Sequence, residues 1–422
     1  MKFKYISSLF IISIFMIGGS CSLDKKKKVE SPQNISPIEI ENIYIILENS
    51  GSMAGYLNGN QFKKTITDLI ADLDKIKTHK DHKLLIKNLS FFTISDNLAL
   101  IKFSGDAYSF CTAINDKGLA VGKTSPMDDF VKLLVDSAET NTVDLLISDF
   151  VIDKKINDFQ NFLQGEFNII FNTARQKNLG VIIYRLTSDF TGNYLPAMGG
   201  PQKVKNITRP YFIWMIGPVE QLNLLREKIL DSKVFYPENE ISFGVPLIPR
   251  NVEVLELSNR VGSWRFKDGN FTKAGLKKDN LKFTLAFNLN NLPNYLKEIN
   301  YLNLNTSIES SSLNILSHKF YSKTDFNSKI HKKEKQKLFD NSHFLEVNIS
   351  QINSSSNNIS ISLNKVNQEW FSKFSTDNDV SLSNNNNLNT FMINYIISGI
   401  ANAYDDLKSN NKYFQLNYKI NQ

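Results

Sequence analysis

The stretch Ile43-Tyr44-Ile45-Ile46-Leu47-Glu48-Asn49-Ser50-Gly51-Ser52-Met53 decides the fold of this chain. An apolar run leads directly to an acid, and two serines follow with one glycine between them. Continuous apolar runs are typical of strands buried on both faces of a parallel sheet, and open α/β sheets bind ligands beyond the carboxyl ends of such strands. A carboxylate and two hydroxyls at that place offer hard oxygen ligands, which suit Mg²⁺ or Ca²⁺. The stretch therefore predicts a buried strand with a candidate cation site at its end.

Strand-like and helix-like segments alternate from residue 38 to about residue 234. The expected strands cover residues 43–47, 84–86, 89–94, 98–103, 143–147, 179–184 and 211–216. The expected helices carry the inward positions Phe62, Ile66, Leu69, Ile70, Leu73 and Ile76; Met127, Phe130, Val131, Leu134 and Val135; Phe159, Phe162, Leu163 and Phe167; and Leu222, Leu225 and Ile229. Such alternation favours an α/β fold with a mainly parallel, doubly wound sheet and helices on both faces.

The segment from Glu48 to Ser52 resembles the first metal-site motif of von Willebrand factor A domains, Asp-x-Ser-x-Ser, with Glu48 in place of the first Asp. That family also places a Thr in a loop before a helix and an Asp at the end of a later strand. Thr124 and Asp149 stand at the corresponding places here, although Phe150 replaces the Gly that usually follows the Asp. The resemblance implies a von Willebrand factor A-like, Rossmann-type domain over residues 38–235.

The resemblance also implies a divalent metal site, with Mg²⁺ or alternatively Mn²⁺ or Ca²⁺ as its ion. Ser50 and Ser52 would bind the ion directly, Thr124 would bind it in one conformational state, and Glu48 and Asp149 would act partly through water. Mg²⁺ requires near-ideal octahedral geometry at about 2.0–2.1 Å, and Glu48 is one methylene longer than the family's Asp. The alternative is a vestigial site in which Ser50 and Ser52 only cap the following helix.

The N-terminus predicts the compartment. Lys2 and Lys4 precede the short apolar stretch 5–17, and Gly18-Gly19-Ser20-Cys21 follows. This order is typical of a secretory signal and is too short to span a membrane. The end of the segment resembles a bacterial lipobox, although Gly18 stands where Leu is usual. We therefore expect a signal peptide over residues 1–20, lipidation of Cys21 and a flexible polar tether over residues 21–37; an uncleaved anchor helix is the alternative.

The pattern changes after about residue 245. Alternate residues are apolar in 281–289, 345–349 and 359–363, which is typical of antiparallel strands with one buried face. We expect a β-rich, sandwich-like domain over residues 245–382, in which the polar turn 353–358 joins a hairpin. Apolar positions between Phe391 and Tyr404 then predict a C-terminal helix over residues 388–407.

Several chemistries lack a motif. Gly118 and Gly122 before Lys123-Thr124 are separated by three residues, whereas a phosphate-binding loop needs four. The histidines show no zinc-binding pair, and Ser50 has no nucleophile elbow around it.

Cys111 is expected to be a small core residue, since lipidation of Cys21 leaves it without a disulfide partner. The formal charge is +7, or 7 − 2 = +5 without Lys2 and Lys4, and no nucleic-acid-binding motif accompanies it.

These observations predict a non-enzymatic protein of the cell envelope, lipid-anchored to the inner or outer membrane of a Gram-negative bacterium. Its von Willebrand factor A-like domain is expected to bind a protein partner, through a divalent metal held by the candidate site, and the β-rich domain to act as a spacer or second contact. Two other classes stay open. One is a metal-dependent hydrolase of envelope polymers, and the other is a structural assembly subunit with a vestigial metal site.

Overall fold

The structure is a computed structural model that describes residues 38–79, 84–94, 98–116, 119, 126–151, 159–197, 199–231, 235–365, 370–382, 386–404 and 412–422. The chain separates into the units Met1–Ser36 and Pro37–Gln422, and all described residues belong to the second. Cys21, the signal peptide, the tether and Thr124 lie outside the described residues.

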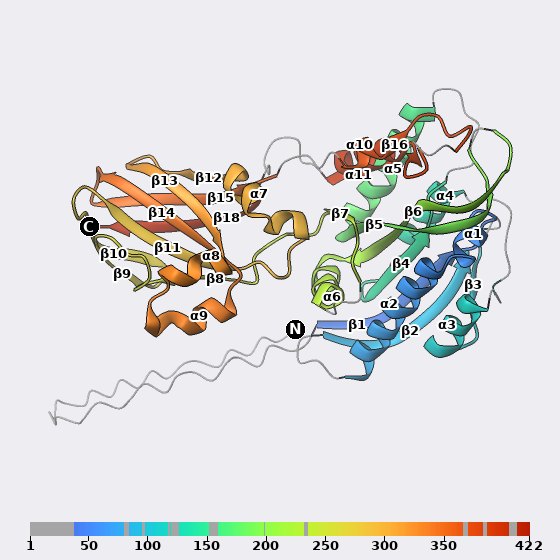
Figure 1. Cartoon of the computed structure of the whole chain (residues 1–422), viewed down its shortest axis with the longest axis horizontal. Coiled ribbons are helices and arrows are strands. Elements are labelled where there is room, and N and C mark those ends of the chain that lie inside the picture. Colours follow the sequence, from blue (N-terminus) through green and yellow to red (C-terminus); the bar gives the residue numbers. More distant parts are fainter. Residues whose placement is uncertain are drawn as a thin grey trace, which may run out of the picture. The chain divides into compact units, whose positions relative to one another are not determined.

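A mixed seven-stranded sheet organises the first part of the chain (Figure 1). Its strands are β1 (Ile38–Glu48), β2 (Leu84–Ile94), β3 (Leu100–Lys102), β4 (Thr142–Ser148), β5 (Leu179–Tyr194), β6 (Gln202–Pro218) and β7 (Asn239–Phe243). They lie in the order β3-β2-β1-β4-β6-β5-β7. Strand β1 is parallel to β2 and β4, whereas the other described pairings are antiparallel.

The α/β prediction is confirmed, but the sheet is mixed rather than mainly parallel. The reason lies in the connection between β5 and β6, which pair along nearly their whole length. Only residues 195–201 join them, and so short a link makes antiparallel neighbours, whereas parallel neighbours need a crossover of a dozen or more residues. The sequence carries no helical pattern between 184 and 211, which is where the alternation of strands and helices stops.

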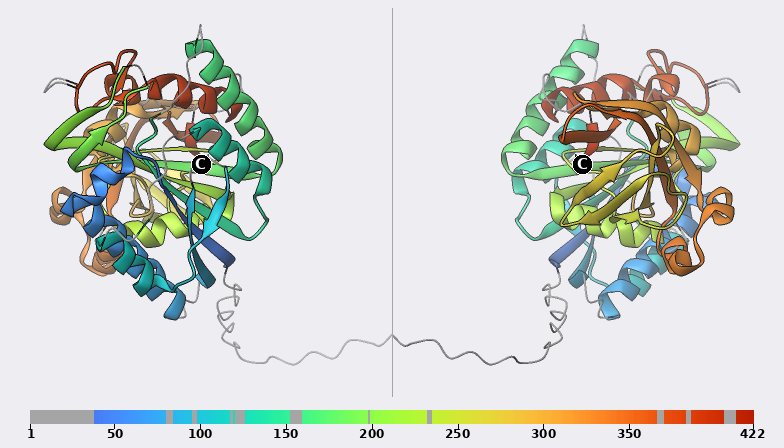
Figure 2. Two further views of the ribbon diagram at one scale, coloured as in Figure 1. Left: turned by 90° about the vertical axis from the view of Figure 1, so that its right-hand side faces the viewer. Right: turned by 90° about the vertical axis from the view of Figure 1, so that its left-hand side faces the viewer.

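Helices cover both faces of this sheet (Figure 2). On one face lie α1 (Met53–Leu57), α2 (Asn60–Thr78), α3 (Ala107–Asn115) and α6 (Val219–Asp231). On the other lie α4 (Met127–Ser137), α5 (Phe159–Gln176) and α11 (Ile393–Tyr404). Successive strand residues alternate between the two buried clusters, so that Ile45 and Leu145 face α2 while Ile46 and Leu146 face α4 and α5.

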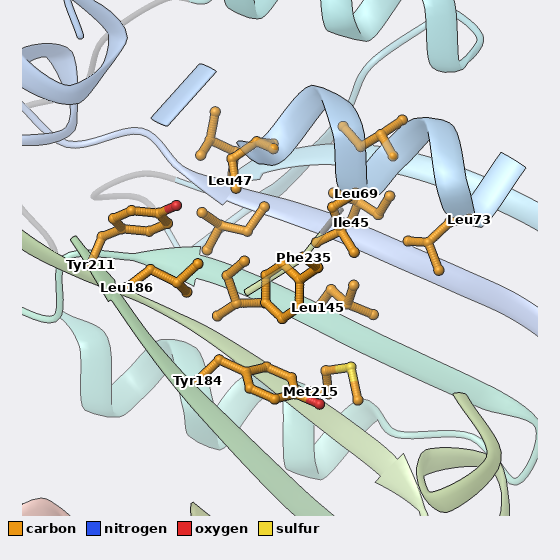
Figure 3. Close-up of a cluster of buried hydrophobic side chains, with 14 of the residues drawn as sticks. Ile45, Leu47, Leu69, Leu73, Leu145, Tyr184, Leu186, Tyr211, Met215 and Phe235 are labelled. Atoms are coloured by element: carbon orange, nitrogen blue, oxygen red, sulfur yellow. The ribbon is translucent and has the colours of Figure 1, made fainter. Parts of the chain in front are cut away.

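The cluster beneath α2 holds the carboxyl halves of β1 and β4 in place. Leu69 and Leu73 of α2 point toward Ile45 of β1, and Leu145 of β4 lies beside them (Figure 3). The predicted helical face 62–73 is buried as expected, with only Ile76 partly exposed. Strand residues packed on both faces have little freedom to shift, so the residues that follow β1 and β4 are presented from a fixed edge.

The second part of the chain is β-rich, as predicted. Its strands are β8 (Asn251–Leu255), β9 (Ser263–Lys267), β10 (Asn270–Gly275), β11 (Leu281–Asn288), β12 (Thr306–Glu309), β13 (Leu313–Ser322), β14 (His343–Ile352), β15 (Ser356–Asn364) and β18 (Lys412–Asn421). An antiparallel sheet has the order β13-β14-β11-β8, and a mixed sheet has the order β12-β15-β18-β10-β9. Apolar side chains from both sheets share one buried cluster. Short helices complete this part: η1 (Asn294–Lys297), α7 (Ile299–Asn305), α8 (Lys323–Phe326), η2 (Asn327–Lys329), η3 (Lys332–Glu334) and α9 (Lys335–Asp340).

The expected hairpin of residues 345–363 was wrong. Strand β14 pairs with β11 and β13, whereas β15 pairs with β12 and β18 in the other sheet. The polar turn between them passes from one sheet to the other. Alternating apolar residues indicate that one face of a strand is buried, but they do not indicate which strand lies beside it.

The segment after the β-rich strands returns to the α/β part. It contains α10 (Trp370–Lys373), β16 (Ser375–Thr376), β17 (Thr390–Phe391) and α11. Helix α11 packs along α5, and its apolar side chains join the cluster on that face of the seven-stranded sheet (Figure 1). The expected helix is therefore present, but strand β18 follows it and fills a central position between β15 and β10.

Candidate functional site

The candidate site lies where β1 and β4 end side by side. The two strands are parallel, and Leu47 of β1 is in register with Ile147 of β4. Because parallel strands end at the same edge of a sheet, the residues that follow Leu47 and Ile147 meet there. Glu48, Ser50, Ser52 and Asp149 are respectively 1%, 4%, 3% and 2% exposed, so this edge is a closely packed polar cluster.

Glu48 is held by a residue that the sequence reasoning missed. The Ser148 hydroxyl donates to Oε2 of Glu48, and the Phe150 amide donates to the Ser148 hydroxyl at 2.8 Å. Sulfur Sδ of Met127, at the start of α4, lies 3.4 Å from the same hydroxyl. Ser148 therefore fixes the orientation of the Glu48 side chain. The contact follows from which residues of β1 and β4 lie opposite each other, and the sequence does not show that pairing.

The two serines lie together at the start of α1. Their hydroxyl oxygens are 3.0 Å apart, and the Met53 amide donates to Ser50 at 3.4 Å. Ser52 occupies the N-cap position of α1 but makes no capping hydrogen bond with its side chain. Helix capping therefore accounts for one long contact of Ser50 and for no contact of Ser52.

Asp149 completes the cluster from β4. The Ser52 hydroxyl donates to its carboxylate, and the Val151 amide donates to Oδ1 at 3.3 Å. Burial raises the pKa of the Asp149 carboxyl, while the Ser52 contact and the positive charge of Arg209 act in the opposite direction. Of the five residues expected at the metal site, the structure brings Ser50, Ser52 and Asp149 into contact and places Glu48 at the end of β1, against Ser148. Thr124 lies outside the described residues.

This cluster fits a divalent ion by its chemistry and by one distance. Two neighbouring ligands of an octahedral ion with bonds of about 2.0–2.1 Å are about 2.8–3.0 Å apart. The Ser50 and Ser52 hydroxyl oxygens have this separation, and Asp149 already contacts Ser52. The same two oxygens can thus share a hydrogen bond or form one edge of an octahedron. All donors are hard oxygens, which Mg²⁺, Mn²⁺ and Ca²⁺ prefer.

The residue after Asp149 has an unusual backbone conformation. Phe150 has φ of +53°, in the left-handed region that favours glycine. Its ring is fully buried and stacks on Trp214 of β6, with ring centroids 4.2 Å apart and an interplanar angle of 11°. The stacking explains how a bulky residue is kept in this conformation. It also fixes the turn that directs Asp149 toward Ser52.

A second acidic group lies at the start of α4. One carboxylate oxygen each of Asp128, Asp129 and Glu166 lies within 4.8 Å of the others. Asp128 is buried, and the other two are half-buried. No sequence pattern indicated this group, because Glu166 comes from α5 and meets α4 only through helix packing. Its carboxylates are compatible with a cation by composition alone.

No known protein family, curated protein or solved structure matches this chain. Functional interpretation therefore depends on the chemistry of the cluster itself. No helix in the described residues has the length and apolar character needed to cross a membrane.

Proposed function

We propose that this chain is a lipid-anchored envelope protein that binds a protein partner at the carboxyl edge of β1 and β4, through a divalent ion held by the candidate site. The observation that carries the proposal is that β1 and β4 end in register, that Ser50, Ser52 and Asp149 meet just beyond these ends, and that Ser148 contacts Glu48 beside them. A von Willebrand factor A-like interpretation of the α/β part and a sandwich-like interpretation of the β-rich part belong to the same proposal.

Each residue has a distinct task in this proposal. Ser50 and Ser52 would hold the ion through their hydroxyls, and Asp149 would orient Ser52 and supply negative charge. Ser148 keeps Glu48 in one position, from which its carboxylate would act through water. When bound, the ion would supply an open coordination position for an acidic oxygen of the partner.

The alternatives differ in what they need near the serines. A hydrolase that used Ser50 as nucleophile would need a base in contact with it. The hydrogen bonds of the described residues join Ser50 to Ser52 and to the Met53 amide, not to a histidine. A structural subunit with a vestigial site needs no ion at all, so ion binding separates it from the proposed function.

Divalent ions are expected to stabilise the protein. An ion at 100 times its Kd that binds only the folded state adds about 2.7 kcal/mol to the free energy of unfolding. Mg²⁺ or Mn²⁺ should therefore raise the Tm, and Ser52→Ala or Asp149→Ala should abolish the rise. Ser362→Ala, which removes a buried hydroxyl of β15, is the matched control and should keep it. Differential scanning calorimetry with and without EDTA measures the effect.

Glu48→Asp provides the sharper comparison, because von Willebrand factor A domains, which this segment resembles, have Asp at the corresponding position. It is expected to bind the ion more tightly than wild type. If neither wild type nor Glu48→Asp responds to any divalent ion, the metal-dependent function is wrong and the structural subunit is favoured. Turnover of envelope polymers that is lost in Asp149→Ala would instead support the hydrolase.

Lipidation of Cys21 is expected to anchor the protein. Mass spectrometry of the mature chain should show an acylated cysteine at the N-terminus, and Cys21→Ala should release the protein from the membrane fraction. Cys111→Ala is the matched control, because this thiol is half-buried in α3 and burial raises its pKa. Intact Met1 or an unmodified Cys21 in the mature protein would contradict lipid anchoring.

A further inference from the structure

The β-rich part contains a hollow of about 570 Å³ on its five-stranded sheet. The residues that line it come from the neighbouring strands β15 and β18, from the end of β12 with the two serines that follow, and from the first residue of β10. Sites for small molecules usually have volumes of roughly 300–1,000 Å³. The hollow therefore has the size of a ligand site, and it shares no residue with the candidate metal site.

The sides of the hollow are held in place by hydrogen bonds. On one side, the Ser310 hydroxyl donates to the carbonyl oxygen of Asn358 at 2.7 Å and accepts from the Ser312 amide at 3.4 Å. On the other side, Nδ2 of Asn270 donates to the carbonyl oxygen of Asp268 at 2.9 Å. Strands β15 and β18 pair along nearly their whole length between these sides. A ligand would thus bind to a formed site, which lowers the entropic cost of binding.

Polar side chains that line the hollow have unused hydrogen-bonding groups. Ser360 lies opposite Asn417, and Asn358 lies opposite Lys419, on the paired strands β15 and β18. Within the described part of the chain, the Ser360 hydroxyl has no hydrogen-bond partner. The exposed Asn358 carboxamide also makes no hydrogen bond to another described residue. Asn417 uses only its Oδ1, which accepts from Nε2 of Gln415 at 2.9 Å.

The other sheet of the β-rich part treats the same residue types differently. On β13 and β14, Nδ2 of Asn314 donates to the Ser350 hydroxyl at 2.8 Å, and Nδ2 of Asn348 donates to the Ser317 hydroxyl at 2.9 Å. Asparagine and serine side chains on neighbouring strands can therefore satisfy one another in this protein. Around the hollow they do not, and their donors and acceptors remain open to a ligand.

The charges around the hollow favour a neutral ligand. Glu309 and Lys419 both line it, so the formal charges of the lining cancel. A polyanion would be repelled by Glu309, and a polycation by Lys419. Carboxamides and serine hydroxyls offer both donors and acceptors, as the hydroxyl groups of a sugar do. Ile359 and Tyr418, which lie opposite each other on β15 and β18, add apolar contacts.

We propose that this hollow binds a short stretch of a neutral glycan. The carboxamides of Asn358 and Asn417 would exchange hydrogen bonds with sugar hydroxyls, and the Ser360 hydroxyl would find a partner in the ligand. The β-rich part would then have a binding function of its own, separate from the protein partner at β1 and β4. Sugar binding would need no divalent ion.

Isothermal titration calorimetry of the full mature chain tests the proposal, with neutral tetrasaccharides of glucose, of mannose and of N-acetylglucosamine as probes. Asn358→Ala and Asn417→Ala should each raise the Kd of a bound tetrasaccharide about fivefold, and the double variant should raise it more than tenfold. Asn314→Ala is the matched control, because it removes an exposed asparagine of the other sheet, and it should leave the Kd unchanged. Binding of none of the three probes, or equal effects of Asn314→Ala and Asn417→Ala, would overturn the proposal.

The class of ligand is tested by salt and by a peptide. The Kd of the tetrasaccharide should not change with the concentration of NaCl, because no ion pair forms. Weaker binding at high salt would contradict a neutral ligand. An acetylated and amidated tetra-alanine peptide should not bind. If this peptide binds instead of the sugars and binding is lost in Asn417→Ala, the hollow is a peptide site and the glycan proposal is wrong.

EDTA separates this inference from the proposed function. Sugar binding should be the same with Mg²⁺ and with EDTA, and also in Ser52→Ala. Sugar binding without any ion-induced rise in Tm would retain the glycan site and reject the metal site. An ion-induced rise in Tm without sugar binding would retain the metal site and reject the glycan site.

Discussion

Phe150→Ala is expected to lower the free energy of unfolding by about 3–5 kcal/mol, the usual range when a buried Phe is truncated to Ala. The ring is fully buried and stacks on Trp214, so its removal leaves a cavity beside β6. Chemical denaturation monitored by circular dichroism measures the loss. The same variant should also reduce the ion-induced rise in Tm, because the turn after Asp149 loses the packing that fixes it.

Phe150→Gly should be less destabilising than Phe150→Ala, by about 1 kcal/mol. The left-handed conformation of Phe150 disfavours every residue with a Cβ by roughly 1–2 kcal/mol, and glycine is free of that strain. Phe212 on β6 is the matched control, since it is equally buried and its ring lies beside that of Phe150. Phe212→Gly should be at least as destabilising as Phe212→Ala. If the Ala and Gly variants rank in the same order of stability at Phe150 and Phe212, the strain assigned to Phe150 is wrong.

Asp144→Asn is expected to stabilise the protein at pH 8 by as much as about 4 kcal/mol. Asp144 lies within β4, opposite Tyr44 of β1, and only 4% of it is exposed. Burial, with a smaller contribution from the negative charge of Glu139, raises the pKa of the Asp144 carboxyl from 3.8 to about 7. One pKa unit corresponds to roughly 1.4 kcal/mol, which gives the estimate for a difference of about three units. Urea unfolding of wild type and variant at several pH values measures it.

The pH range over which Asp144 changes the stability follows from the direction of its pKa shift. The folded state holds the Asp144 proton more tightly than the unfolded state, so this residue stabilises the fold fully below pH 3.8. That stability is lost as the pH rises through the interval from 3.8 to about 7. The difference between Asp144→Asn and wild type should therefore be near zero at pH 3.8 and largest above pH 7. Glu139→Gln should give a smaller gain over the same window, and a gain independent of pH would contradict the assignment.

Local spacing predicted the elements of the α/β part well. The apolar run before Glu48 is a strand buried on both faces, and the helical face of α2 is buried as its spacing indicates. Local spacing also placed Glu48, Ser50, Ser52 and Asp149 after strands of the same sheet. These successes have one cause: a strand or helix buries the residues that its own period turns inward, whatever lies opposite.

Pairing could not be predicted in the same way. The sequence does not show that β5 and β6 form one long antiparallel ladder, or that β14 and β15 belong to different sheets. It also does not show that α11 returns to α5 and that a strand follows it. Which elements become neighbours is decided by contacts between residues far apart in the chain, and such contacts leave no local period.

By itself, the sequence determined the α/β class, the β-rich second part and the acid and hydroxyls at the end of β1. Only the tertiary structure decided what surrounds them. Ser148 reaches Glu48 because β1 and β4 are in register, and Phe150 is held in a strained turn because Trp214 lies against it. Both contacts join residues that are far apart in the chain, and such contacts leave no local pattern in the sequence.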